Sequence, residues 1–308
     1  MTPCVATFVC SPDAPVLTDA LLTKLSGIMS TPETPVWLCR GIAADIAGAA
    51  PSDHAGDLLR LRDNIEQAIE SLGVPVDVVV QRSTNRRKRL LVADMDSTMI
   101  GQECIDELAD YAGFKERVAA ITERAMRGEI AFEPALRERV ALLRGLPAAV
   151  IDKVITERIR PMPGGATLVA TMRANGAYTC VVSGGFTAFT ARIAAMIGFD
   201  EQRANALRVD GDGRLTGEVV EPVLGRDAKR DTLIALRERL RLEAEDTLAV
   251  GDGANDIPMI KAAGIGVAFR GKPALKEAAD AHIDHGDLTA LLYAQGYRRD
   301  EFVEVIGK

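Results

Sequence analysis

Residues 90–98 read LLVADMDST, an uninterrupted apolar run that ends at two aspartates, Asp94 and Asp96. Such a run is typical of a strand that is buried on both faces of a parallel sheet. Residues two apart in an extended chain point to the same side, so both carboxylates project into one place. They repel each other unless one is protonated or a cation lies beside them. The stretch therefore predicts a central parallel strand that is followed by an acidic site.

Apolar runs of the same kind recur further along the chain, at residues 178–182, 247–250 and 265–269. Helical patterns lie between them, at residues 165–174, 186–197, 229–240 and 257–262. Alternating strands and helices predict a doubly wound α/β fold, in which ligands bind beyond the carboxyl ends of the strands. Polar segments follow two of the runs at that position, SGG at 183–185 and GDGAND at 251–256.

Two further regions have other patterns. Residues from about 101 to 160 are helical by pattern with no convincing strand, which predicts a helical insertion after the first strand. The first 82 residues have the expected order βαββαβ, typical of a small ferredoxin-like α+β unit, with strands near 5–10, 36–39, 41–48 and 74–80 and helices near 17–28 and 58–72. The polar and basic segment 81–89 is interpreted as a solvated linker.

Composition excludes several classes of function. The 308 residues have a net charge of -7, and the one basic cluster, Arg86 to Arg89, is short, so we expect no nucleic-acid partner. No apolar run approaches the ~18 residues of a membrane span, and no signal peptide is expected at the N-terminus. The five scattered cysteines show no metal-binding spacing and are typical of reduced thiols, so we expect a cytoplasmic protein.

Four segments together resemble the haloacid dehalogenase-like phosphatases: DMDST at 94–98, VVSGG at 181–185, Lys229, and GDGAND at 251–256. The likeness spans roughly residues 88–290, and the stretches 96–109 and 126–147 are similar to its phosphoserine phosphatase branch. The resemblance implies a Rossmann-like domain at 83–308 with a helical cap at about 101–160. It also implies that residues 1–82 form an ACT-like domain, which could bind an amino acid or serve as a dimerisation or folding module.

The resemblance also implies the roles of the acidic residues. Asp94 would attack phosphorus and form an aspartyl-phosphate, and Asp96 would serve as general acid and then general base. A magnesium ion would be held by the Asp94 carboxylate, the Asp96 main-chain carbonyl and Asp252. Lys229 would offset the charge on Asp94 and on the phosphoryl group, and Asp256 would orient Lys229 or a metal-bound water.

Substrate binding is implied for residues of both the core and the cap. Ser183 and the Gly184 N–H would donate to phosphate oxygens, and Asn255 would hydrogen-bond within the substrate site. In the cap, Glu103 would bind the substrate's ammonium group and Arg139 its carboxylate. Three cap residues leave alternatives open: Arg137 competes with Arg139, and Met126 and Phe132 could wall the substrate or simply fill the cap core.

The expected activity is hydrolysis of O-phospho-L-serine to L-serine and phosphate, the last step of serine biosynthesis. Two alternatives remain at this stage. The first is a phosphotransferase, or a phosphatase of another small phosphomonoester, which would use the same core with other cap contacts. The second is an amino-acid-sensing regulator, against which the complete set of acidic residues and Lys229 argues. We also expect a homodimer formed through the N-terminal unit.

Overall fold

The computed structural model describes residues 2–50, 55–126, 129–225 and 227–305, and within these ranges the side chains of Ala55, Ala125 and Met126 are not described. The expectation for Met126 in the substrate wall therefore lies outside the described part of the chain. Among the described residues, no helix combines the length and apolar character needed to cross a lipid bilayer.

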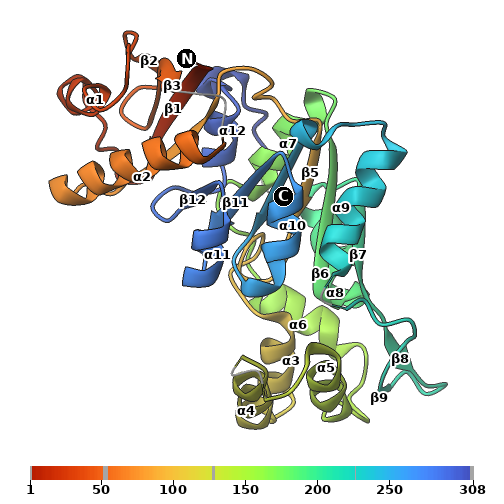
Figure 1. The fold of residues 1–308 in the computed structure, drawn as a ribbon. Coiled ribbons are helices and arrows are strands. Elements are labelled where there is room, and N and C mark those ends of the chain that lie inside the picture. The colour runs from red at the N-terminus through yellow and green to blue at the C-terminus, as the bar shows by residue number, and fades with distance from the viewer. Residues whose placement is uncertain (1, 51–54, 127–128, 226, 306–308) are drawn as a thin grey trace.

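The N-terminal unit is an antiparallel sheet covered by two helices, as the sequence predicted (Figure 1). The strand order β2-β3-β1-β4 follows from the βαββαβ chain order. Alternate residues of β1, among them Phe8, are fully buried against Leu22, Leu25 and Ile65 of the helices. The elements are β1 (Thr2–Cys10), α1 (Asp19–Ser26), β2 (Val36–Cys39), β3 (Ala43–Ala50), α2 (Ala55–Leu72) and β4 (Val76–Arg82).

The larger unit is built on a six-stranded sheet in the order β12-β11-β10-β5-β6-β7, and its neighbouring strands are parallel. Leu91 and Ala93 of β5 pack into one hydrophobic cluster and Leu90 and Val92 into another, so helices cover both faces. The strands are β5 (Leu90–Ala93), β6 (Tyr178–Phe186), β7 (Glu201–Asn205), β10 (Thr247–Gly251), β11 (Ile265–Phe269) and β12 (Ala281–Ile283). The doubly wound α/β prediction is confirmed.

The order of this sheet reverses at β5, because the chain continues to β6 and β7 on one side and to β10, β11 and β12 on the other. Ligands of doubly wound sheets bind at such a switch point. The flanking helices are α7 (Gly165–Ala174), α8 (Thr187–Ile197), α9 (Ala228–Arg239), α10 (Ile257–Ala262), α11 (Pro273–Ala278) and α12 (Ala290–Ala294). Short 3-10 turns, η1 (Ala244–Asp246), η2 (Ala254–Asp256) and η3 (Arg299–Glu301), complete the unit.

Four helices between β5 and α7 gather beyond one end of the sheet (Figure 1), namely α3 (Cys104–Tyr111), α4 (Lys115–Met126), α5 (Phe132–Ala141) and α6 (Val150–Arg158). We call them the cap. A hairpin of β8 (Leu207–Val209) and β9 (Leu215–Val219) lies against the cap, with the Gly145 N–H donating to the Leu215 carbonyl at 2.8 Å. The sequence analysis missed β7, β12 and this hairpin because they are short and β7 lacks an apolar run.

The interpretation of residues 81–89 as a solvated linker is wrong in part, because Gln81 and Arg86 are half-buried and Lys88 is buried, while the other six residues are exposed. Gln81 and Arg82 complete β4, and Arg86 is largely enclosed between the two units. Its guanidinium donates to both carboxylate oxygens of Asp45, at 2.7 and 3.0 Å, and to the Ala294 carbonyl. The two units pack against each other here, and their buried carbonyl and carboxylate oxygens need hydrogen-bond donors. The basic side chain of Arg86 supplies these donors within the protein.

Other polar contacts join the two units as well. The Asp77 carboxylate of β4 accepts hydrogen bonds from the N–H groups of Asp284, His285 and Gly286 beyond β12. Arg62 of α2 donates to the carbonyls of Ala279 and Asp280. These bonds fix the N-terminal sheet against the end of the six-stranded sheet at β12.

Candidate active site

The polar segments that follow the central strands meet at the carboxyl ends of β5, β6 and β10. They line one cavity of about 410 Å³, which lies between the sheet and the cap. From the core, Asp94, Asp96, Ser183, Gly184, Lys229, Asp252 and Asn255 line it, and from the cap Glu103, Phe132 and Arg139. The cavity thus brings together the core residues that the sequence singled out, except Asp256, along with the cap pair.

Asp94 is the buried centre of this site, with 4% of its surface exposed. Its Oδ1 accepts from the Met95 N–H at 2.7 Å and lies 2.6 Å from Lys229 Nζ. Burial and the neighbouring Asp256 charge raise the pKa of Asp94, and Lys229 opposes them. One carboxylate oxygen is therefore held by donors, while Oδ2 has no hydrogen bond recorded to the described residues.

Lys229 lies between two carboxylates at the first turn of α9. Its Nζ lies 2.5 Å from Asp256 Oδ1, in addition to the contact with Asp94. Asp256 Oδ2 in turn accepts from the N–H groups of Asp252 and Gly253. Burial alone would lower the pKa of Lys229, but the charges of Asp256 and Asp94 outweigh it and raise the pKa. Lys229 is therefore a fixed cation beside Asp94, and Asp256 holds it there.

Asp96 is also held at both carboxylate oxygens. The Cys104 N–H at the start of α3 donates to Oδ1 at 2.9 Å, and the Ser183 hydroxyl donates to Oδ2 at 3.1 Å. Burial raises the pKa of Asp96, although these hydrogen bonds favour its charged form. A carboxyl group with a raised pKa can hold a proton and release it, as a general acid requires.

Three buried carboxylates, those of Asp94, Asp252 and Asp256, each have an oxygen within 4.8 Å of the others. Hard divalent cations prefer such all-oxygen surroundings. Both oxygens of Asp256 are already engaged by Lys229 and by backbone N–H groups, which leaves Asp94 and Asp252 as the available carboxylates. The residues present therefore fit a cation at the ends of β5 and β10.

The SGG segment is tightly packed at the end of β6. A Cβ added to Gly184 would lie 3.2 Å from the Phe132 ring, and one added to Gly185 would lie 3.1 Å from Ser183 Oγ. The Gly184 carbonyl accepts from buried Asn205, which the sequence analysis did not single out. Asn205 lies at the end of β7, a strand that also lacked a sequence signal, so only the folded sheet reveals this support.

The cap places two opposite charges at the cavity. Glu103 Oε1 accepts from the Ser97 hydroxyl at 2.8 Å, and burial and then the Asp96 charge raise the pKa of Glu103 to about 7. Arg139 donates to the Ala135 carbonyl and to the Thr122 hydroxyl. Burial lowers its pKa, and the nearby acids Asp106 and Glu103 oppose that effect.

The structure separates Arg139 from its neighbour Arg137. Arg137 pairs with Glu133 and Glu221, at 2.6 and 2.5 Å, and it is not among the residues that line the cavity. Lys272, which the sequence analysis did not single out, also lines the cavity and lies 3.5 Å from Asp252. The only indication in the sequence was the position of Lys272 shortly after β11, at the same edge of the sheet.

Comparison with known families identifies the family to which the chain belongs. Residues 91–261, more than half of the chain, match the family model of the haloacid dehalogenase-like hydrolases. This chain belongs to that family. The hydrolase is 42% identical over 241 residues to a phosphoserine phosphatase of Streptomyces coelicolor, covering 78% of this chain and 58% of that protein. It is 40% identical over 277 residues to a phosphoserine phosphatase of Mycobacterium tuberculosis, covering 90% of this chain and 64% of that protein.

The hydrolase therefore spans about 58–64% of the length of these two relatives. Among solved structures, a probable phosphoserine phosphatase of Vibrio cholerae is 30% identical with a TM-score of 0.74. That comparison covers 99% of this hydrolase and 90% of the other chain. The likeness thus extends over the N-terminal sheet as well as the six-stranded sheet.

Proposed function

We propose that this hydrolase is a phosphoserine phosphatase that converts O-phospho-L-serine and water to L-serine and phosphate. One observation carries the proposal. A single cavity joins the buried residues Asp94, Lys229 and Asp252 to a cap pair of opposite charge, Glu103 and Arg139. Phosphoserine has the matching groups, a phosphate at one end and an ammonium and a carboxylate at the other.

In the first half of the proposed reaction, Asp94 Oδ2 attacks phosphorus and the bond from phosphorus to the serine oxygen breaks. Asp94 then has the phosphoryl group, and the departing serine oxygen takes the proton of Asp96. The raised pKa of Asp96 supports this role, because the group must arrive protonated. In the second half, Asp96 takes a proton from a water that attacks the phosphorus of the aspartyl-phosphate. The bond from phosphorus to Asp94 Oδ2 breaks, which releases phosphate and restores the Asp94 carboxylate.

Charge stabilisation comes from groups already fixed around Asp94. Lys229 is held by Asp256 and needs no reorganisation to face the phosphoryl oxygens. We propose that Ser183 and the Gly184 N–H donate to these oxygens and that Asn255 hydrogen-bonds to the bound substrate. Ser183 donates to Asp96 in this structure, so its hydroxyl would turn toward the phosphate on binding.

We further propose Mg²⁺ as the cofactor, held by the carboxylates of Asp94 and Asp252 and by the Asp96 main-chain carbonyl. Their oxygen chemistry and the 4.8 Å cluster support this assignment. When bound, the ion neutralises negative charge shared by the phosphate and the carboxylates. Asp256 serves by orienting Lys229, because its own oxygens are already occupied.

In the cap, we propose that Glu103 binds the substrate ammonium and that Arg139 binds its carboxylate. Phe132 contributes to the wall over Gly184, where its ring lines the same cavity. A sugar phosphate lacks both groups that this pair recognises. Selectivity for phosphoserine would then arise in the cap, while the core performs the chemistry.

The test is phosphate release from phosphoserine, phosphothreonine and a sugar phosphate, each measured with Mg²⁺ and with a chelator. We expect turnover of phosphoserine above the others, loss of that turnover with the chelator, and recovery when Mg²⁺ is restored. Turnover of another phosphoester in place of phosphoserine would reject the substrate and retain the chemistry. Undiminished turnover in the chelator would reject the magnesium assignment.

We also propose that residues 1–82 and 83–308 act as separate domains, with the helical cap at about 101–160 inserted in the second, and that the enzyme forms a homodimer in the cytoplasm. Val36 on β2, a strand with one unpaired edge, is 49% exposed and supports self-association there. The free state of all five cysteines supports the location. Light scattering on the full chain and on Val36→Lys tests the dimer, which the charged variant should convert to a monomer.

A further inference from the structure

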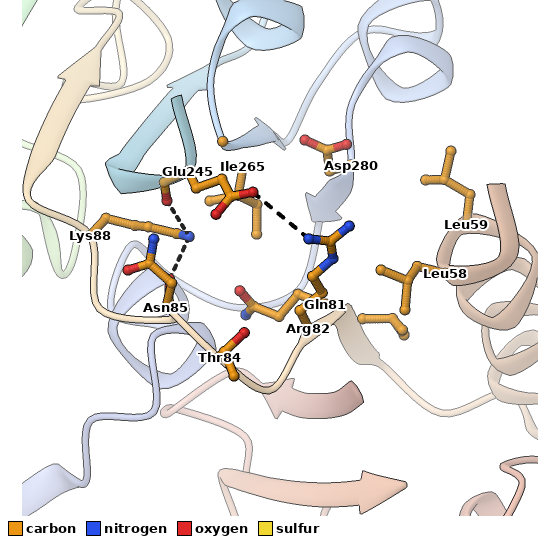
Figure 2. A pocket seen from close by; sticks show the side chains of 12 residues that line it. Leu58, Leu59, Gln81, Arg82, Thr84, Asn85, Lys88, Glu245, Ile265 and Asp280 are labelled. Carbon is orange, nitrogen blue, oxygen red and sulfur yellow. Dashed lines mark hydrogen bonds and ion pairs between the residues drawn. The ribbon is translucent and has the colours of Figure 1, made fainter. Parts of the chain in front are cut away.

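A second cavity lies between the N-terminal unit and the six-stranded sheet (Figure 2), and none of its lining residues lines the active-site cavity. Its volume is about 260 Å³. Leu58 and Leu59 of α2 form one side, and Glu245 and Ile265 of the larger unit form another. Ile265 begins β11 and Glu245 precedes β10, so this cavity lies at the amino ends of these two strands, whereas Asp252 and Lys272 of the active-site cavity follow their carboxyl ends.

The cavity contains a buried cation. Lys88 is 8% exposed, and its Nζ donates to the carbonyls of Asn85 and Glu245 at 2.7 and 2.8 Å. An ammonium group has three N–H bonds, and the hydrogen bonds recorded for the described residues use two of them. Its backbone N–H is fixed by Gln295 Oε1. Lys88 is therefore a positioned cation with one donor remaining at the cavity.

Besides Lys88, the cavity is lined by Asp280, which accepts a hydrogen bond from the Gly266 N–H, and by an exposed ion pair. Arg82 lies 3.7 Å from Glu245, and the two side chains are 45% and 71% exposed. Ion pairs as exposed as this contribute only ~0–1 kcal/mol, so an incoming group can separate them at little cost. Figure 2 shows Glu245 between Lys88 and Arg82, where its displacement would open the cavity toward both cations.

Four apolar side chains form part of the remaining wall, beside the polar groups of Gln81, Thr84, Asn85 and Asp280. Leu58, Leu59, Val80 and Ile265 line it, and Figure 2 shows both leucines on the helix beside Arg82. A cavity of 260 Å³ has room for roughly nine water-sized groups, at about 30 Å³ each. Pockets for small molecules combine such an apolar surface with a few convergent polar groups. An occupant should therefore be small, with one charged end and one aliphatic end.

We infer that this cavity binds a small carboxylate with a short aliphatic tail. The carboxylate would accept the third N–H of Lys88 and lie near Arg82, and the tail would pack on Leu58, Leu59 and Ile265. An aliphatic amino acid and a simple branched carboxylic acid share this chemistry. They differ in the ammonium group, which Glu245 and Asp280 could receive. The inference does not depend on the proposed phosphatase activity, because the site is a separate cavity.

The test measures binding of isovalerate and L-leucine to the full chain by calorimetry, together with the shift in thermal unfolding midpoint. We expect at least one probe to bind at millimolar concentration and to raise the midpoint, because a ligand that binds only the folded state stabilises it. Lys88→Met should weaken binding at least about tenfold. Arg89→Met, an exposed basic neighbour, is the matched control and should leave binding unchanged.

Lys88 also joins Asn85 to Glu245, so its replacement could affect folding. Thr84→Trp provides an independent check, because Thr84 is exposed at the cavity and an indole there would fill it. Ser83→Trp, one residue away and outside the lining, is its control. Thr84→Trp should abolish binding that Ser83→Trp retains. Absence of binding by both probes, or equal binding in all four variants, overturns the inference. Binding of L-leucine alone would assign a role to the ammonium group.

Discussion

Lys229 and Arg86 are both enclosed cations held by carboxylates, and they lie in different parts of the fold. Lys229 contacts Asp94 and Asp256 at the carboxyl ends of the sheet and borders the 410 Å³ cavity. Arg86 contacts Asp45, Thr7 and the Ala294 carbonyl between the two units. The guanidinium of Arg86 donates its hydrogen bonds to acceptors of the protein. Asp94, beside Lys229, has one carboxylate oxygen, Oδ2, that is available to a ligand.

Under the proposed function, this difference separates a group that stabilises the fold from one that acts on a substrate. A buried charge costs free energy unless it is paired, so both sites need their partners. At Arg86 the pairing is complete within the chain. At Asp94 the acids outnumber the cation, and the excess negative charge is suited to a divalent ion and a phosphoryl group. Variants at Asp94 should therefore lose activity, and variants at Arg86 should lose stability.

The largest effect is expected for Asp94→Asn. Loss of the nucleophile should lower kcat for phosphoserine by roughly 10^4-fold or more. Burial raises the pKa of Asp94, which means that its charged form is unfavourable in the folded state. The neutral amide should therefore leave the urea unfolding midpoint at pH 8 no lower than that of the wild type. Full Mg²⁺-dependent activity in this variant would exclude the covalent mechanism.

Arg86→Met should show the opposite pattern. Removing one partner leaves Asp45 buried and unpaired, which should cost about 3–5 kcal/mol in the free energy of unfolding. Urea denaturation measures this loss, and kcat of the remaining folded enzyme should change less than about twofold. Arg87→Met is the control, because Arg87 pairs with Glu301 at an exposed position and should cost less than about 1 kcal/mol. Adding Asp45→Asn to Arg86→Met should recover part of the stability.

Arg139→Met tests the cap between these extremes. Loss of a half-buried partner for the substrate carboxylate should cost about 2–3 kcal/mol, which raises KM for phosphoserine roughly 30- to 150-fold. Turnover of an analogue without the carboxylate should change little. Arg137→Met is the matched control, two residues away, because Arg137 is paired with Glu133 and Glu221 outside the cavity. Equal effects of the two variants on KM would show that Arg139 does not bind the substrate carboxylate.

The smallest effect is expected from pH. The pKa of Glu103 is raised to about 7 by burial and by Asp96, so its carboxylate is protonated below that value and charged above it. Only the charged form attracts an ammonium, so KM for phosphoserine should fall as pH rises from 6 to 8, by up to about tenfold. The deamino analogue corrects for titration of the phosphate and should lack this change. Glu103→Gln should abolish the difference between the two substrates.

Much of the fold could be predicted because its signals are local. The apolar run 90–93 predicted β5 with the same bounds, and the helical patterns at 165–174 and 257–262 match α7 and α10. Strand β7 could not be predicted, since EQRAN has no apolar run and forms a strand only by pairing with β6. The hairpin β8–β9 is equally dependent on its contact with the cap.

The candidate site was predictable in its residue types and less so in its contacts. Asp94, Asp96 and Asp252 each follow a strand whose carboxyl end lies at the switch point, so their meeting was expected from the chain order. The support of Gly184 by Asn205 and the nearness of Lys272 to Asp252 had no such signal. Both involve side chains far apart in sequence that only sheet packing brings together.

The sequence by itself determined the chemistry that this hydrolase can offer, because strand periodicity and the residues after each strand are encoded in consecutive positions. Tertiary structure alone decided how each charge is used. It placed Arg139 at the cavity and paired Arg137 with Glu221 outside it. It also enclosed Arg86, from the expected linker, in a contact with Asp45 between the two units. The physical reason is that burial depends on the whole fold, and a charge without water must find its partner wherever packing places one.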